Sequence, residues 1–191
     1  EDKAEFVAMG KNIAMQVAAM RPEYLSKESI SADELEKMRS ITIDSSLNKP
    51  ESLPKPILSA LFQKAIDEKL FSDEDVAAYQ DNQKSPYLFN FLSKEAVATL
   101  ASLAVAGKEE YMNNKIFAGA VEGRIKKQIK EICLLEQTFV RSDLFDGTVA
   151  GYVAQVAKNN NADIKVVDFV RLVKGEGLEK REDNFADEVA S

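Results

Sequence analysis

One segment near the start of the chain predicts both a helix and its end: Lys11-Asn-Ile-Ala-Met-Gln-Val-Ala-Ala-Met-Arg-Pro22. Apolar residues recur here at intervals of three and four, which places their side chains on one face of an α-helix. The stripe consists of Phe6, Met9, Ile13, Val17 and Met20. Pro22 should end the helix, because proline lacks an amide hydrogen and disfavours helical geometry in the residue before it.

The same period continues through the middle of the chain. Ser31 and Glu34 form a capping box, so a helix should follow them through Met38. A proline-rich break at 48–56 comes next. Further helices are expected over about 57–70, after the capping residues Ser72 and Ser93, and over about 108–132.

Residues 44–119 are therefore predicted to form an antiparallel helical arm, either a hairpin or a coiled coil. Gly119 and Gly123 lie four apart near its end, and because glycine weakens a helix, they suggest close backbone packing. Tyr87, Phe89 and Phe91 form an aromatic cluster, which either anchors the arm tip internally or contacts a partner.

Beyond the arm the pattern changes from helical to mixed. Residues 138–141 predict a short strand, and 148–158 predict a helix. Residues 163–174 carry apolar side chains on both alternating sets, which is typical of a strand buried on both faces. Such a strand needs neighbours, but 132–135 is the only further candidate, so we expect sheet partners from a preceding segment or another protomer. The predicted fold class is α+β: helix-rich, with a small antiparallel or mixed sheet covered by helices.

Composition excludes several classes of function. The chain has 191 residues and a net charge of -7, which disfavours direct binding to nucleic acid. No apolar run approaches the roughly 18 residues of a membrane span, and no secretory signal opens the chain. It begins at Glu1 without an initiator methionine, so we expect a fragment or a processed product.

Candidate catalytic and metal-binding groups are few. The sequence has no histidine, and its one cysteine, Cys133, lies in an apolar run, as expected for a buried thiol in a reducing cytoplasm. Asp73-Glu-Asp75 is better explained as a helix cap than as a metal site, and Gly175-Glu-Gly177 as a turn. We therefore predict no enzyme activity, no catalytic residues, no metal site and no cofactor.

Two blocks, taken together and in this order, resemble a known family. The first is the Ile13-Ala-Met15 helix, and the second joins Glu122-Gly-Arg124 and Phe139-Val140 to the turn Gly175-Glu-Gly-Leu-Glu179. This combination, over about 6–43 and 118–190, resembles the C-terminal core, or dimerisation region, of bacterial elongation factor Ts, with a long helical insert and a terminal module. That family promotes nucleotide exchange on the translation GTPase elongation factor Tu.

The resemblance implies a domain layout and a set of partner-binding residues. Residues 1–43 and 120–174 would form the C-terminal core subdomain, 44–119 the arm, and 175–191 the C-terminal module. By position, the residues that would bind elongation factor Tu are Leu134, Leu135, Gln137, Phe139, Phe185, Glu188 and Val189. The family's Thr-Asp-Phe-Val motif, which perturbs the magnesium ion bound beside the nucleotide, does not occur in this sequence.

The sequence thus predicts a docking part of an exchange factor, with a homodimer possible, no membrane partner and a cytoplasmic location. A helical scaffold that self-associates without exchange activity is the alternative. A small hydrolase would need a polar pocket, and the sequence shows no sign of one.

Overall fold

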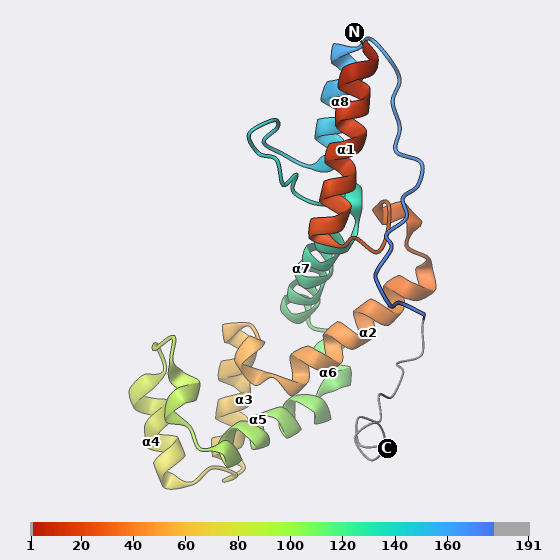
Figure 1. The fold of residues 1–191 in the computed structure, drawn as a ribbon. Coiled ribbons are helices and arrows are strands. Elements are labelled where there is room, and N and C mark those ends of the chain that lie inside the picture. The colour runs from red at the N-terminus through yellow and green to blue at the C-terminus, as the bar shows by residue number, and fades with distance from the viewer. Residues whose placement is uncertain (1, 178–191) are drawn as a thin grey trace, which may run out of the picture. The chain divides into compact units, whose positions relative to one another are not determined.

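The computed structural model of the chain describes residues 2–177, and in this range the fold is all-helical (Figure 1). The α-helices are α1 (Asp2–Met20), α2 (Ala32–Asn48), α3 (Lys55–Asp67), α4 (Asp73–Asn82), α5 (Lys94–Ala106), α6 (Lys108–Met112), α7 (Lys115–Ile132) and α8 (Val149–Asn159). Four 3-10 turns join them: η1 (Lys27–Ser29), η2 (Pro50–Ser52), η3 (Leu88–Phe91) and η4 (Leu134–Glu136).

The predicted α+β fold with a small sheet is wrong. Across residues 2–177 the only β-type pairing is one isolated parallel bridge, between Tyr24 and Cys133. Residues 138–141 form a loop, and 163–174 run as an extended chain whose backbone amides donate to no carbonyl of the described backbone. Alternating apolar residues favour a strand only where a neighbouring strand accepts its backbone hydrogen bonds. No such neighbour lies beside these segments in the described range.

The chain divides into two compact units. Unit 1 combines residues 1–21 with the part of the chain from 139 onward, and unit 2 spans 22–138. Each unit has its own buried side chains and is described by itself.

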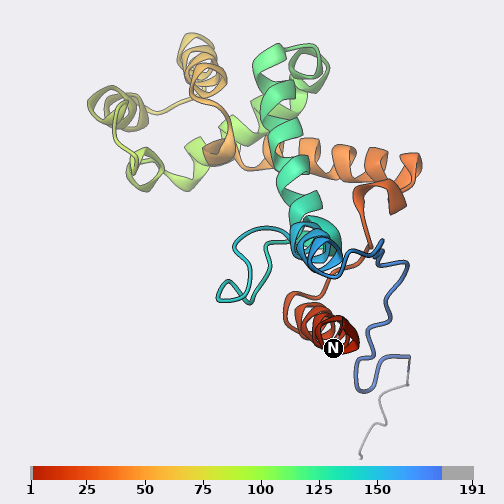
Figure 2. The ribbon, with the colours of Figure 1, turned by 90° about the horizontal axis from the view of Figure 1, so that it is seen from above.

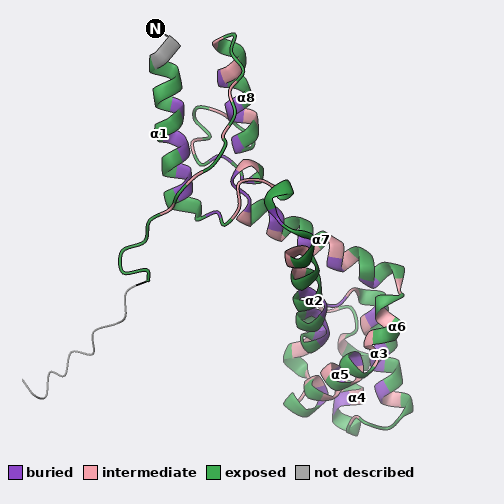
Figure 3. Cartoon of the chain, turned by 90° about the vertical axis from the view of Figure 1, so that its right-hand side faces the viewer, coloured by how far each residue is buried: buried purple, intermediate pink, exposed green. Residues whose placement is uncertain are grey.

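In unit 1, α1 packs against α8 through one narrow stripe (Figures 1 and 3). Met9, Ile13 and Val17 of α1 are buried, whereas Phe6 and Met20, predicted for the same stripe, are about half exposed. The buried residues of α8 are Val149, Tyr152, Val153 and Val156. After α8 the chain runs back in extended form (Figure 2). Residues 166 and 168–174 line hollows together with α1.

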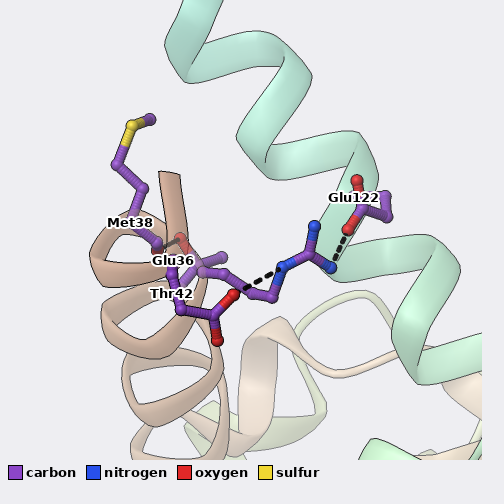
Figure 4. A network of polar contacts seen from close by, with 5 residues as sticks. Glu36, Met38, Thr42 and Glu122 are labelled. Atoms are coloured by element: carbon purple, nitrogen blue, oxygen red, sulfur yellow. Dashed lines mark hydrogen bonds and ion pairs between the residues drawn. The ribbon is translucent and has the colours of Figure 1, made fainter. Parts of the chain in front are cut away.

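In unit 2, α2 and α7 pack together and are joined by arginine side chains. Arg124 of α7 donates hydrogen bonds to the Ser46 hydroxyl and to the Ser52 carbonyl. Arg39 of α2 forms ion pairs with Glu36 and Glu122 (Figure 4).

The close packing predicted at the two glycines of α7 is absent from the described structure. A Cβ added at Gly119 or at Gly123 would meet no atom within 4 Å. The two glycines therefore face open space rather than a neighbouring backbone.

The arm is not a two-helix hairpin. Residues 50–106, which we call the lobe, form α3, α4 and α5 around shared core residues such as Phe62, Leu100 and Ala104. The predicted serine caps are confirmed, because Ser72 accepts from the Asp75 amide and Ser93 from the Ala96 amide.

The helix predicted over about 108–132 is interrupted. It divides into α6 and α7 at Asn113 and Asn114. The Asn114 side chain accepts from the amides of Ile116 and Phe117, so it caps α7. The interruption is therefore stabilised locally by the asparagine.

Candidate functional site

The segment that follows α7 is held by backbone bonds to the chain that follows α1. In unit 2, Tyr24 donates to the carbonyl of Ile132 at 3.0 Å and accepts from the amide of Leu134 at 2.8 Å. Leu135 donates to the carbonyl of Leu25 at 3.0 Å. These three bonds fix the direction in which the chain leaves α7.

The predicted partner-binding residues of this segment differ in exposure. Leu134 and Gln137 are fully buried, and Leu135 is half-buried. The Gln137 amide group donates to the carbonyl of Glu131 at 2.7 Å, so its polar end is used inside unit 2. In this structure Leu134 and Gln137 support the segment from within, and their role in binding a partner stays a prediction.

Phe139 begins a loop in unit 1 that ends at Thr148, and this loop is closed at its base. The amide of Phe139 donates to the carbonyl of Gly147 at 2.8 Å. The Phe139 ring is buried and stacks on Tyr152 of α8, with centroids 4.2 Å apart. Phe145 adds a second ring contact to Tyr152, at 6.3 Å. We call residues 139–148 the presentation loop.

The presentation loop is also tied to α1 by a buried amide side chain. The Gln16 side-chain oxygen accepts from the amide of Val140 at 2.8 Å, and Gln16 is completely buried. One turn earlier, Asn12 donates to the Tyr152 hydroxyl at 3.0 Å. Two polar residues of α1 therefore set the position of the loop and of the tyrosine beneath it.

Two apolar side chains point outward from this fixed loop. Val140 is 40% exposed and Leu144 is 46% exposed. Between them Arg141 makes a bidentate ion pair with Asp143, at 2.7 and 2.8 Å. The Arg141 guanidinium holds the pKa of the Asp143 carboxyl below its usual range, so both charges persist at neutral pH. The loop thus presents two apolar side chains on a segment held by hydrogen bonds at its base, an arrangement suited to docking.

Sequence reasoning missed Val140 and Leu144 as surface residues, and it missed Asn12 and Gln16 as their support. One signal was present: Asn12 and Gln16 lie four apart, directly beside the apolar stripe of α1. A polar residue at such a position is buried and therefore needs a hydrogen-bond partner. Of the other predicted residues, Phe185, Glu188 and Val189 lie outside the described range.

The described residues offer little for catalysis. Cys133 is buried, and burial raises its pKa to about 11, so the thiol stays protonated. In the range that the structure covers, no three His, Cys, Asp or Glu side chains are placed to hold a metal ion. Over the same residues, no helix is long and apolar enough to cross a membrane.

Comparison with known proteins identifies the family. The family model described as Elongation factor TS matches residues 1–176. The chain therefore belongs to the elongation factor Ts family.

Individual relatives are similar over nearly the whole chain. Elongation factor Ts of Clostridioides difficile strain 630 is 33% identical over 187 residues, which are 98% of this chain and 41% of the relative. That of Desulforamulus reducens is 31% identical over 98% of this chain and 57% of the relative. That of Clostridium acetobutylicum is 52% identical over a shorter segment of 75 residues, 39% of this chain and 24% of the relative. The chain thus spans about half the length of the first two relatives, and no solved structure matches it.

Proposed function

We propose that this chain is part of a guanine-nucleotide exchange factor for elongation factor Tu, promotes GDP release during polypeptide elongation in the cytoplasm, and is not itself an enzyme. The observation that carries the proposal is the family match over residues 1–176. The relatives that are similar over almost the whole chain, insert included, support it further.

The part played by this chain is docking. An exchange factor must bind the nucleotide-free GTPase more tightly than the nucleotide-bound one, because a ligand with equal affinity for both states shifts nothing. The resemblance attributes the step at the nucleotide to a Thr-Asp-Phe-Val motif, which this sequence does not contain. This chain would accordingly supply binding surface and orientation rather than the wedge.

The proposed docking surface is the presentation loop with its outward residues Val140 and Leu144. Phe139 would act by holding this loop from beneath, and Leu135 contributes the exposed part of its side chain in unit 2. Leu134 and Gln137 would support the neighbouring segment. We further propose that Phe185, Glu188 and Val189 in a C-terminal module, residues 175–191, complete the contact.

The remaining layout follows the family. We propose residues 1–43 and 120–174 as the C-terminal core subdomain and 44–119 as an insert. The partner is a protein, with neither nucleic acid nor membrane bound directly, and a homodimer is compatible with this role.

The test is a titration of the chain against elongation factor Tu loaded with fluorescent GDP, recording binding and nucleotide release separately. We expect binding without faster release. Full acceleration would contradict the division between docking and wedge. Absence of binding would contradict docking itself and favour a self-associating helical scaffold.

Variants of the presentation loop sharpen this test. Leu144→Ser should weaken binding about tenfold, a loss of about 1.4 kcal/mol, because it removes an exposed apolar contact. Ser142→Ala, an exposed change in the same loop, is the matched control and should leave binding unchanged. Unchanged binding of Leu144→Ser would mean that the loop is not part of the interface.

A further inference from the structure

The lobe contains a cavity that lies outside the presentation loop. Its volume is about 370 Å³, within the size range of ligand-binding pockets. It opens between α3, α4 and the turn before η3. Its apolar lining residues are Leu53, Leu58, Phe62, Tyr79, Pro86, Leu88 and Phe89.

The floor of this cavity is fixed by ring stacking. Phe62 is fully buried and lies parallel to Tyr79, with centroids 4.1 Å apart and planes 6° apart. The centroid of the Phe89 ring lies 6.1 Å from that of the Phe62 ring. Leu88, the residue before Phe89, is buried. An apolar group that enters would meet a preformed surface, which lowers the entropic cost of binding.

The rim of the cavity carries more positive than negative charge. Lys55 and Lys84 both line it and are exposed, and neither forms an ion pair with another residue of the range 2–177. Glu51 is the one acidic residue in the lining. This local excess of positive charge stands out in a chain whose net charge is -7.

A second hollow of the lobe has the opposite character. Its volume is about 510 Å³, and its charged lining residues are Glu74, Asp75 and Glu95. A negatively charged partner is therefore repelled from this hollow and attracted to the cavity beside Lys55 and Lys84.

We propose that the cavity binds an acidic peptide segment of a partner protein. One aromatic or aliphatic side chain of the peptide enters over the partly exposed rings of Tyr79 and Phe89, and flanking carboxylates lie against Lys55 and Lys84. A peptide fits better than a small molecule because Tyr87, next in sequence to the lining residues Pro86 and Leu88, is 66% exposed and is available to a longer ligand. The proposal does not depend on the exchange function.

The probe is the peptide acetyl-Glu-Asp-Phe-Asp-Glu-amide, titrated into the isotope-labelled full chain and followed by amide chemical shifts. Shifts are expected at Ser59, Gln83 and Ser85, which line the cavity. A peptide with Ser in place of Phe, or with Lys and Arg in place of the acids, should bind at least about tenfold more weakly. Equal binding of the three peptides, or shifts confined to other parts of the chain, would overturn the proposal.

Variants separate the cavity from the rest of the surface. Lys84→Glu and Ser59→Trp should each weaken binding of the Phe peptide about tenfold, the first by reversing a rim charge and the second by filling the cavity. Lys64→Glu makes the same charge change on α3 outside the lining and should have no effect. If 3-phenylpropionate alone bound as tightly as the peptide, the occupant would be a small organic anion and the peptide proposal would be wrong.

Discussion

The carboxylate of Asp75 accepts hydrogen bonds from both the backbone amide and the hydroxyl of Ser93, at 2.8 and 2.7 Å. It also accepts from the hydroxyl of Ser72 at 2.9 Å. Ser72 and Ser93 are the capping residues of α4 and α5, so one buried carboxylate joins the starts of two helices. The sequence predicts two separate caps, and in the folded lobe Ser72 and Ser93 join with Asp75 in one polar cluster.

Replacing Asp75 with Ala should destabilise the protein by about 1–3 kcal/mol, because the amide and hydroxyl of Ser93 lose their acceptor. Urea unfolding followed by circular dichroism measures this change. Asp73→Ala, an exposed change in the same helical turn, is the control and should cost far less. Equal losses for the two variants would mean that the cluster contributes nothing specific.

The same carboxylate predicts a pH dependence. Burial alone would raise the pKa of Asp75, but hydrogen bonds from the Ser93 amide and from the hydroxyls of Ser93 and Ser72 lower it overall. Because the folded pKa lies below the unfolded value, the stabilisation is present above the unfolded pKa and is lost as pH falls through the folded one. Urea midpoints measured from about pH 6 down to about pH 3 should fall less steeply for Asp75→Asn than for the wild type. Parallel curves would refute this assignment.

The presentation loop should separate stability from docking. Phe139→Ala removes a buried ring stacked on Tyr152 and should cost about 3–5 kcal/mol of unfolding free energy. Val140→Ser changes an exposed side chain and should leave stability within about 0.5 kcal/mol while weakening binding to elongation factor Tu. Thermal unfolding and a binding titration of both variants test this contrast. It would fail if Val140→Ser destabilised the chain as strongly as Phe139→Ala.

Arg124 should matter for the join between α2 and α7. Its guanidinium donates to the Ser46 hydroxyl and the Ser52 carbonyl, a forked arrangement that a lysine ammonium does not reproduce. We expect Arg124→Lys to lower the unfolding free energy by about 1–2 kcal/mol. Lys127→Met, on an exposed side of the same helix, should have little effect. Thermal unfolding of the two variants measures these changes, and equal losses would mean that the forked hydrogen bonds of Arg124 contribute nothing specific.

Cys133 should be unreactive while the protein is folded. Burial, with smaller contributions from Glu136 and Glu28, raises its pKa to about 11, so little thiolate forms near neutral pH. Labelling with a thiol-specific chromogenic disulfide at about pH 8 should be slow in buffer and fast in urea. Rapid labelling in buffer would show that the thiol is accessible in the native state.

Several features could be predicted because they depend only on neighbours in the sequence. The capping box of Ser31 and Glu34 is confirmed, and so is the end of α1 before Pro22. The turn at Gly175 and Gly177 is confirmed too, with φ of 83° and 79°. In each case the hydrogen bonds or backbone angles involve residues within a few positions of each other, so a short window contains the whole cause.

The presentation loop shows why its site could not be predicted in full. Phe139 is apolar, but its sequence position does not reveal that its ring stacks on Tyr152. The backbone of Val140 is held by Gln16, whose side-chain oxygen accepts a hydrogen bond from the Val140 amide across 124 positions of sequence. This bond fixes the loop from which the Val140 side chain is exposed. Which apolar residue is buried and which faces a partner depends on these long-range contacts.

The sequence by itself determined most of the helices, the serine caps at Ser31, Ser72 and Ser93, and the family, because periodicity, capping residues and short motifs are all local. Only the tertiary structure decided that residues 163–174 pair with no strand of the described range, and that the lobe packs around Phe62 into one core shared with α2 and α7. It also decided that Asp75 joins two helix starts. The physical reason is that strand pairing, core packing and buried hydrogen bonds each need two partners, and the sequence names the partners without saying which of them meet.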